Sequence, residues 1–318
     1  MRRWTRGLAL TLALGCGLEA GAQTIAVVPK GTTHEFWRTV QAGALKAGRE
    51  LGVEIIWKGP QREDDREQQI QLVEDFVSRK VDGIVLAPLD ERALARPVRE
   101  ARDAGIPTVV FDSDLEGTDH VSFVATDNDR GGALAAEHLG GLLGGRGRVA
   151  LLRYLQGSAS NTRREEGFLR TLRERFPEIE LISSNLYAGA TVEGAYQQAE
   201  GLLNRFPALD GVFCPNAPVT IGMLRALEDA GRAGRVRFVG FDATTRLIEA
   251  LVEEKIDALV VQDPMAIGEI GVRTLVAHLR GEAVPTRIAT PLALVSRENL
   301  ATPAVRRLLD PDFPPPGD

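Results

Sequence analysis

Cysteine, histidine and aromatic residues are scarce in this chain of 318 residues, and each shortage argues against a class of function. Only Cys16 and Cys214 are present, so no cysteine spacing typical of a structural metal site can form. Aromatic residues make up 5% of the chain, the formal net charge is −6, and no basic face is interleaved with aromatic side chains. Since nucleic-acid binding requires such a face, the sequence predicts no nucleic-acid partner. It also predicts no metal and no cofactor.

The motifs of common enzymes are also missing. The four histidines, at positions 34, 120, 138 and 278, fit no Ser-His-Asp or metal-binding pattern. No Gly-x-Ser-x-Gly turn and no phosphate-binding loop occur. A secreted sugar hydrolase would need paired carboxylates, and Asp112 and Asp242 could form such a pair in principle. Because the histidines form no catalytic pattern and neither a Gly-x-Ser-x-Gly turn nor a phosphate-binding loop is present, we expect a protein that is not an enzyme.

The first 22 residues have the layout of a secretory signal peptide. Arg2, Arg3 and Arg6 form a basic start, an apolar run covers residues 8–14, and small residues end at Ala22. The apolar run is too short to anchor the chain across a membrane. We therefore expect residues 1–22 to be removed on export and the protein to be periplasmic.

Cys16 leaves two exported forms open. Gly15 before Cys16 fits a lipoprotein signal, whereas Ala13 stands where leucine is usual, so a lipid anchor at Cys16 is an alternative to cleavage after Ala22. Cleavage after Ala22 would leave Cys214 as the single cysteine, and no intrachain disulfide could then form.

From Thr24 onward, short apolar runs alternate with amphipathic stretches of helical length. Continuous β-branched and aliphatic runs are typical of parallel strands buried on both faces. The expected strands lie at 25–28, 53–57, 83–86, 108–111 and 121–124, and then at 148–152, 179–182, 211–214, 236–239 and 258–261. The expected helices lie near 35–51, 66–80, 91–104, 127–143, 162–175, 191–206, 217–231, 244–254 and 265–280.

Two successive arrays of this kind predict an α/β protein with two doubly wound, parallel-sheet lobes. We expect an N-terminal lobe of residues 24–126 plus 263–291 and a C-terminal lobe of residues 127–262 plus 292–309. A multi-strand hinge would join them where the chain passes residues 121–126, 262–264 and the neighbourhood of Pro291. The tail at residues 310–318 contains four prolines and is expected to be disordered.

Polar side chains follow most of the expected strands. Ligands of open α/β sheets bind beyond the carboxyl ends of the strands, so two facing lobes would direct these side chains into one cleft. The segments concerned are 29–37, 58–62, 112–114 and 154–164, with Asn216, Asp242 and Gln262. This mixture suits a ligand rich in hydroxyl groups. Residues 154–161 could cap the following helix through Asn161 or Thr162, touch the ligand or form the lip of the closed cleft, and the sequence leaves all three open.

Six motifs at these positions resemble the ribose-binding and related periplasmic sugar-binding proteins, whose fold is shared with repressors of the lactose-repressor family. In chain order they are Val27-Val28-Pro29-Lys30 with Glu35-Phe36-Trp37 and Gly43, Asp127-Asn128 with Gly131-Gly132, Arg164-Glu165-Glu166-Gly167-Phe168, Phe213-Cys214-Pro215-Asn216, Val239-Gly240-Phe241-Asp242 and Val261-Gln262-Asp263-Pro264. No single motif is specific, but the series covers the chain from Thr24 to about Leu309. The resemblance implies a type I periplasmic binding fold.

The resemblance also implies a set of ligand-binding residues. Phe36 and Trp37 would form an apolar wall against a sugar ring, and His34 would make a hydrogen bond. Asp112 would accept hydroxyl protons, whereas Ser113 stands where the ribose receptor carries arginine, so the preferred sugar need not be ribose. The polar ring would be completed by Arg164, Asn216, Asp242 and Gln262.

A second resemblance, to receptors for rhamnose and for the furanosyl quorum signal, is carried by Pro29-Lys30, Gly59-Pro60 and the segment 111–114. That reading would add Lys30 and Asp114 to the site.

We expect an exported, monomeric solute-binding protein that traps a monosaccharide-like ligand and delivers it to the membrane permease of an ABC transporter. A sensor that presents the ligand to a chemoreceptor or histidine kinase is the alternative. A transcriptional regulator of the same fold is disfavoured, because a signal peptide occupies the place of the helix-turn-helix.

Overall fold

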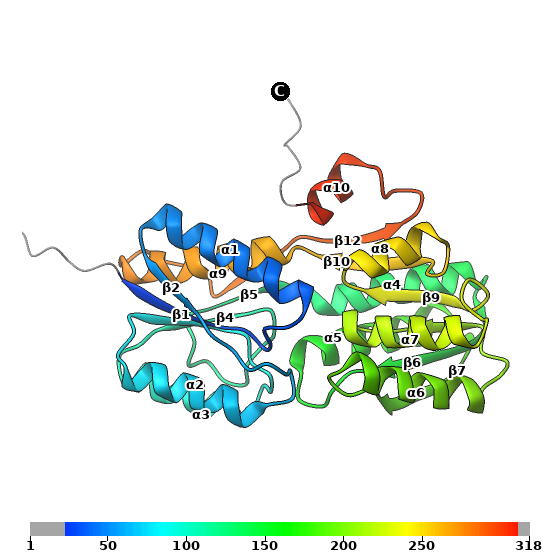
Figure 1. Ribbon diagram of the computed structural model, residues 1–318, viewed down its shortest axis with the longest axis horizontal. Coiled ribbons are helices and arrows are strands. Elements are labelled where there is room, and N and C mark those ends of the chain that lie inside the picture. Colours follow the sequence, from blue (N-terminus) through cyan, green and yellow to red (C-terminus); the bar gives the residue numbers. More distant parts are fainter. Residues whose placement is uncertain (1–22, 311–318) are drawn as a thin grey trace, which may run out of the picture.

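The computed structural model describes residues 23–310. The predicted signal peptide with Cys16, and all of the predicted disordered tail except Asp310, lie outside the described residues. Figure 1 shows two α/β bodies side by side, each built around a six-stranded sheet. We call the two sheets sheet A and sheet B. No helix between residues 23 and 310 is long and apolar enough to cross a lipid bilayer.

Sheet A is parallel throughout, with the strand order β11-β5-β4-β3-β1-β2. Its strands are β1 (Thr24–Val28), β2 (Glu54–Trp57), β3 (Gly83–Leu86), β4 (Thr108–Phe111), β5 (Ser122–Thr126) and β11 (Arg287–Thr290). The helices around it are α1 (Glu35–Leu51), α2 (Arg66–Ser78), α3 (Ala95–Asp103) and α9 (Pro264–Leu279). Helices α1 and α9 cover one face of sheet A, and α2 and α3 cover the other.

Sheet B repeats this plan in the order β12-β10-β9-β8-β6-β7, with β12 antiparallel to β10. Its strands are β6 (Arg146–Arg153), β7 (Glu178–Tyr187), β8 (Gly211–Phe213), β9 (Arg237–Phe241), β10 (Ala258–Gln262) and β12 (Leu292–Ser296). Its helices are α4 (Asn128–Leu142), α5 (Ala159–Arg175), α6 (Val192–Arg205), α7 (Ala217–Asp229), α8 (Thr245–Val252) and α10 (Pro303–Leu309). Helices α4 and α5 lie on one face, and α6, α7 and α8 on the other.

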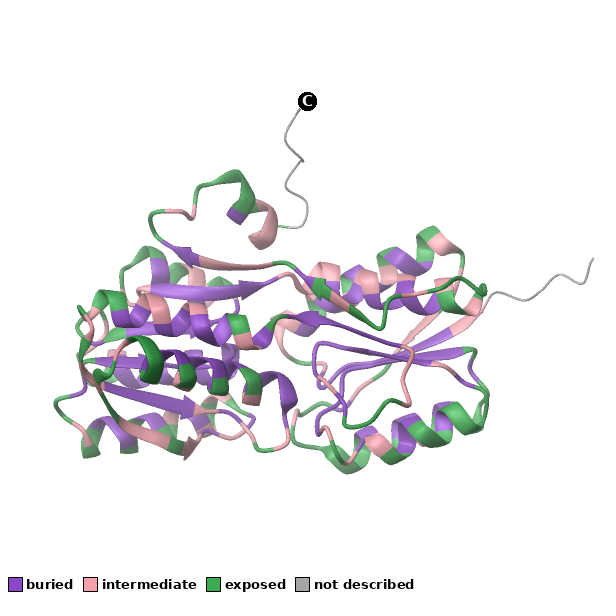
Figure 2. Ribbon diagram, turned by 180° about the vertical axis from the view of Figure 1, so that it is seen from behind, coloured by how far each residue is buried: buried purple, intermediate pink, exposed green. Residues whose placement is uncertain are grey.

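Successive residues of a strand point to opposite faces of the sheet. In β1, Ile25 and Val27 belong to the core beneath α1 and α9, whereas Ala26 and Val28 belong to the core beneath α2 and α3. Both faces are therefore apolar, as expected of parallel strands with a helical layer on each side. Figure 2 shows the same arrangement, with buried residues along the strands and exposed residues on the outer sides of the helices. The predicted α/β fold with two doubly wound lobes is confirmed.

Several element boundaries differ from those predicted. Helix α3 begins at Ala95 and not at residue 91, because the Asp90 carboxylate accepts hydrogen bonds from the backbone of Arg92 and Ala93 and holds a turn there. Strand β7 extends to Tyr187, well beyond the predicted end at residue 182. Strands β11 and β12 and helix α10 were not predicted.

The chain passes between the two sheets at three places: after β5, after β10, and at Pro291 between β11 and β12. These segments lie together, since the Thr126 hydroxyl donates to Gln262 Oε1 at 2.8 Å and lies 3.3 Å from the Thr290 hydroxyl. Each of the first two crossings leads into a helix whose N-terminus is capped by an aspartate: Asp127 caps α4 and Asp263 caps α9.

Candidate functional site

A cavity lies between the two sheets, at the carboxyl ends of their strands. The space, counted with its opening to solvent, is about 380 Å³. From the sheet A side it is lined by Lys30, His34, Phe36, Trp37, Glu63 and Asp112, and from the sheet B side by Ser160, Asn161, Arg164, Asn216, Ala217, Pro218, Asp242 and Gln262. The structure thus brings together all the predicted site residues except Ser113 and Asp114.

Two aspartates occupy equivalent positions on the two sheets. Asp112 follows β4 and Asp242 follows β9, and each has left-handed backbone geometry, with φ of 62° and 70° respectively. The amide of Asp112 donates to Val124 O at 2.9 Å, and the amide of Asp242 donates to Val260 O at 2.8 Å. Such backbone strain is uncommon outside glycine and concentrates at functional sites. Here it turns both carboxylates into the cavity.

The Asp242 carboxylate is held on both oxygens. Oδ1 accepts from Gln262 Nε2 at 2.7 Å, and Oδ2 accepts from the backbone amide of Ala217 at 2.9 Å. Burial raises the pKa of Asp242, while the positive charge of Arg164 and the Gln262 hydrogen bond act in the opposite direction. Because Gln262 also accepts from Thr126, this network connects the cavity to the crossing segments.

Arg164 lies on α5 and is almost completely buried. Its Nε donates to Asn128 Oδ1 at 2.8 Å, one terminal nitrogen donates to Pro215 O at 2.9 Å, and the guanidinium carbon lies 3.9 Å from the centre of the Phe241 ring. Burial lowers the pKa of Arg164, and the charges of Asp242 and Asp112 oppose that shift. A guanidinium has five N–H donors, so others remain for a ligand.

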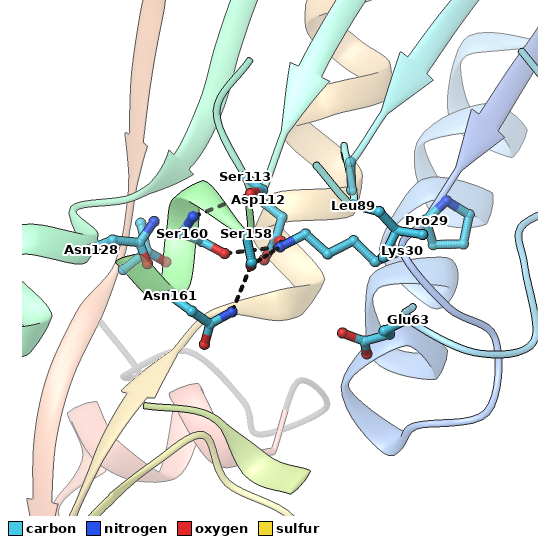
Figure 3. Close-up of polar contacts among 12 residues, drawn as sticks. Pro29, Lys30, Glu63, Leu89, Asp112, Ser113, Asn128, Ser158, Ser160 and Asn161 are labelled. Atoms are coloured by element: carbon cyan, nitrogen blue, oxygen red, sulfur yellow. Dashed lines mark hydrogen bonds and ion pairs between the residues drawn. The ribbon is translucent and has the colours of Figure 1, made fainter. Parts of the chain in front are cut away.

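Lys30 extends from the end of β1 to the start of α5 (Figure 3). Its ammonium donates to the Ser160 hydroxyl at 2.9 Å and to the Ser158 hydroxyl at 3.2 Å, and it lies 3.3 Å from Asp112 Oδ2. The side chain is only 3% exposed. A buried lysine with three such partners joins the two halves of the site directly.

Glu63 is a site residue that the sequence analysis missed. Its Oε1 accepts from Trp37 Nε1 and its Oε2 accepts from the Tyr154 hydroxyl, both at 2.8 Å. Burial, followed by the charge of Glu63, raises the pKa of Tyr154 well above its usual value, so this phenol remains a donor. The polar segment 58–62 after the second predicted strand was the available signal, and it ends one residue before Glu63.

Trp37 and Phe36 form one side of the cavity at the start of α1. Their rings meet edge to face with centroids 5.0 Å apart, and the Trp37 ring also contacts Phe111 at 6.3 Å. Trp37 is 2% exposed and belongs to the core beneath α1, whereas Phe36 is partly exposed. His34 Nε2 lies 3.8 Å from Glu63 Oε1.

Asn216 is the N-cap of α7, and its Oδ1 accepts from the amide of Val219 at 3.2 Å. Its side chain therefore serves the helix terminus as well as lining the cavity.

Ser113 and Asp114 lie outside the cavity, contrary to the predicted lining set. The Ser113 hydroxyl accepts a hydrogen bond from the Ser160 amide at 3.2 Å, and its side chain is completely buried. Asp114 Oδ1 accepts from the Leu115 amide, and Oδ2 lies 3.7 Å from Arg287. Both residues follow the left-handed Asp112, and neither lines the cavity.

The sequence of residues 25–283 matches the family model described as a periplasmic binding protein domain. The chain is 29% identical over 302 residues to the D-allose-binding periplasmic protein of Escherichia coli, an alignment that covers 92% of this chain and 96% of that protein. It is 27% identical over 277 residues to the ribose import binding protein of Bacillus subtilis, covering 86% of this chain and 88% of that protein.

Solved structures show the same similarity. A carbohydrate transporter solute-binding protein from Agrobacterium radiobacter in complex with D-arabinose is 31% identical, with a TM-score of 0.89, covering 92% of this chain and 100% of that chain. An ABC transporter solute-binding protein from Agrobacterium vitis with bound D-fucose is 34% identical, with a TM-score of 0.87, covering 90% and 99%. All four relatives are binding proteins, and three of them are described as parts of import or transport systems, which confirms the expectation that the chain is not an enzyme.

Proposed function

Because the chain belongs to the family of periplasmic binding proteins, we propose that it is an exported receptor for a monosaccharide or similar polyhydroxylated molecule and delivers its ligand to the permease of an ABC importer. The observation that carries this proposal is the cavity itself. Three carboxylates, a guanidinium and three carboxamides line it at the carboxyl ends of the strands of both sheets.

The chemistry of the lining suits hydroxyl groups. A hydroxyl both donates and accepts, so it pairs with carboxylates such as Asp112 and Asp242 and equally with the donors of Arg164. Phe36 supplies an apolar surface for the C–H face of a ring. The relatives named above bind or import neutral sugars, which favours this class of ligand and favours transport over a sensor role.

Ligand capture would proceed by closure of the two lobes about the three crossing segments. We assign residues 24–126 and 263–291 to one lobe and residues 127–262 and 292–309 to the other. Polar contacts already join the lobes beside the cavity: Lys30 Nζ with Ser160, Tyr154 with Glu63, the Ser160 amide with Ser113, and the Glu91 amide with Gly157 O. A ligand that bridges both lobes gains contacts only in the closed form, and this differential affinity shifts the population toward closure.

We place the mature protein in the periplasm as a monomer that reaches the membrane through its permease or a lipid on Cys16. Mass spectrometry of the mature N-terminus distinguishes cleavage after Ala22 from lipidation.

The function is tested by titrating the mature chain with a panel of monosaccharides and polyols, using calorimetry and tryptophan fluorescence. At least one sugar should bind, and Asp242→Asn should weaken its binding about 100-fold, through loss of charge-assisted hydrogen bonds. Asp114→Asn is the matched control, because Asp114 lies outside the cavity and should leave affinity unchanged. Absence of both heat and thermal stabilisation with every compound would contradict the proposal.

A further inference from the structure

Asn161 is a buried cavity residue with an unsatisfied acceptor. It lies in the first turn of α5, lines the cavity and is 4% exposed. Its Nδ2 donates to the Ser158 hydroxyl at 2.9 Å, whereas its Oδ1 has no hydrogen-bond partner among residues 23–310. Buried polar atoms are almost always paired, so an orphaned carbonyl oxygen in a binding cavity indicates a partner that the chain does not supply.

Helix capping does not account for this side chain. The N-cap of α5 is Ser158, which makes no side-chain cap hydrogen bond, and Asn161 stands inside the helix. Of the roles left open for this segment, ligand contact and a place at the lip of the closed cleft are both compatible with the position of Asn161.

The orientation of the Asn161 amide is fixed from the opposite side of the cavity. Ser158 Oγ accepts from Asn161 Nδ2 and also from the ammonium of Lys30, which in turn is paired with Asp112 (Figure 3). In this arrangement the nitrogen is bonded to Ser158, and the oxygen has no partner among residues 23–310.

Glu63 and Asp242, two other acceptors that line the cavity, already accept hydrogen bonds from the protein. Both carboxylate oxygens of Glu63 accept from Trp37 and Tyr154, and both of Asp242 accept from Gln262 and the Ala217 amide. Asn161 Oδ1 therefore differs from them, since it accepts nothing from the protein.

We propose that Asn161 Oδ1 accepts a hydrogen bond from one specific hydroxyl of the bound sugar and makes the receptor discriminate against analogues that lack this hydroxyl. The inference rests on the proposed function and adds a specificity-determining residue to it. A sugar without that hydroxyl would bury the amide oxygen unpaired, whereas the correct sugar satisfies it.

The test measures affinities of the mature chain by calorimetry for D-ribose, D-allose, D-arabinose and D-fucose, each with its monodeoxy derivatives. For the sugar that binds most tightly, removal of one particular hydroxyl should weaken binding to the wild type by about tenfold or more. In Asn161→Ala, removal of that same hydroxyl should weaken binding by only about twofold. The penalties for removing the other hydroxyls should stay as in the wild type. Asn161→Asp keeps an acceptor at the same place and should retain or increase the penalty.

Thr162→Ala is the matched control. Thr162 follows Asn161 in α5 but does not line the cavity, so the discrimination should persist whatever happens to overall affinity. A uniform loss of affinity in Asn161→Ala for the parent sugar and all derivatives would assign the side chain a structural role and overturn the inference, as would a lost penalty in Asn161→Asp. If the wild type binds none of the monosaccharides and polyols of the wider panel, the proposed function fails as well. If it binds one and Asn161→Ala discriminates as the wild type does, only the role of Asn161 fails.

Discussion

At the scale of single residues, Arg164 makes three contacts at once, two hydrogen bonds and one contact with an aromatic ring, that a lysine could not make together. Its guanidinium is planar, spans two hydrogen-bond acceptors on separate segments and stacks on Phe241. A lysine ammonium is a compact point charge without that fork. We expect Arg164→Lys to weaken sugar binding by about 100-fold, the loss of roughly two charge-assisted hydrogen bonds.

The neighbouring Arg163 provides the control for this change. Its side chain is 64% exposed and lies 3.4 Å from Glu166, away from the cavity. Calorimetric titration of Arg163→Lys should give wild-type affinity, and equal losses in the two variants would contradict the assigned role of Arg164.

Glu165 is expected to make stability depend on pH. Its side chain is 3% exposed, and burial raises its pKa to about 7, although the Tyr154 amide and the Arg153 charge favour the ionised form. The folded state therefore holds this proton more tightly than the unfolded chain does. Between about pH 4.5 and 7 unfolding releases the proton, so the free energy of unfolding falls as the pH rises through that window.

Glu165→Gln should remove this fall, which amounts to at most about 3 kcal/mol. Urea unfolding at pH 5 and pH 8 measures it, and the variant should lose less stability between the two than the wild type. Glu166→Gln, at a side chain that is 51% exposed, is the control. Parallel pH profiles for the wild type and Glu165→Gln would show that the carboxyl does not titrate in this range.

Individual site residues could be predicted where a short sequence motif places them at the end of a strand. Asp112 and Asp242 were predicted because each directly follows the apolar run of a buried strand. Ser113 was predicted because it stands where the ribose receptor carries arginine, but its hydroxyl accepts from the Ser160 amide and it does not line the cavity. A local sequence pattern does not report such a contact between distant segments. Glu63 was missed because its partners, Trp37 and Tyr154, belong to distant segments.

At the scale of elements, helices α1 and α9 cross with their backbones in contact. A Cβ at Gly268 would lie 2.0 Å from Val40 O, and a Cβ at Gly43 would lie 2.1 Å from Met265 O. Gly268→Ala should therefore destabilise the fold by about 1–3 kcal/mol through overpacking. Denaturant unfolding measures this loss.

Gly201, in α6, differs from Gly268 because a side chain at this position would have free space. A Cβ there meets nothing within 4 Å, so Gly201→Ala should stabilise the protein by about 0.5–1 kcal/mol through helix propensity. Were the two substitutions to change stability alike, the close approach of α1 and α9 would not hold in solution.

The elements that could be predicted are those with a strong local signal. Strands such as β3 and β4 are continuous apolar runs buried on both faces, and the sequence predicts them closely. Strand β7 is at the edge of sheet B and contains Ser183, Ser184 and Asn185, so its second half has no apolar periodicity. Strands β11 and β12 are largely half-exposed, and α10 spans only seven residues, so tertiary contacts define them more than composition does.

At the scale of the whole molecule, the two lobes meet through residues that no local pattern connects. Lys30 and Ser158 are 128 positions apart, and Glu35 and Thr245 are 210 apart. The sequence could predict that two arrays of strands face each other, because the carboxyl ends of parallel strands collect polar loops. It could not predict which side chains would pair across the gap, since that depends on the geometry of closure.

Gly157 provides a way to hinder closure without altering the cavity. It precedes α5 with a φ of 89°, its carbonyl accepts from the Glu91 amide of the other lobe at 3.0 Å, and a Cβ would lie 2.3 Å from Asp90 Oδ2. Gly157→Ala should therefore hold the lobes apart, weaken sugar binding by about tenfold or more, and give a larger radius of gyration in small-angle X-ray scattering at saturating sugar.

Gly189 separates this effect from simple backbone strain. It has a φ of 83° and meets nothing within 4 Å, so Gly189→Ala carries the same cost of a left-handed conformation without a contact between the lobes. Both variants should unfold at a lower temperature than the wild type, but only Gly157→Ala should lose affinity and compactness. If both lose affinity equally, backbone strain accounts for the loss and the contact at Gly157 is not part of closure.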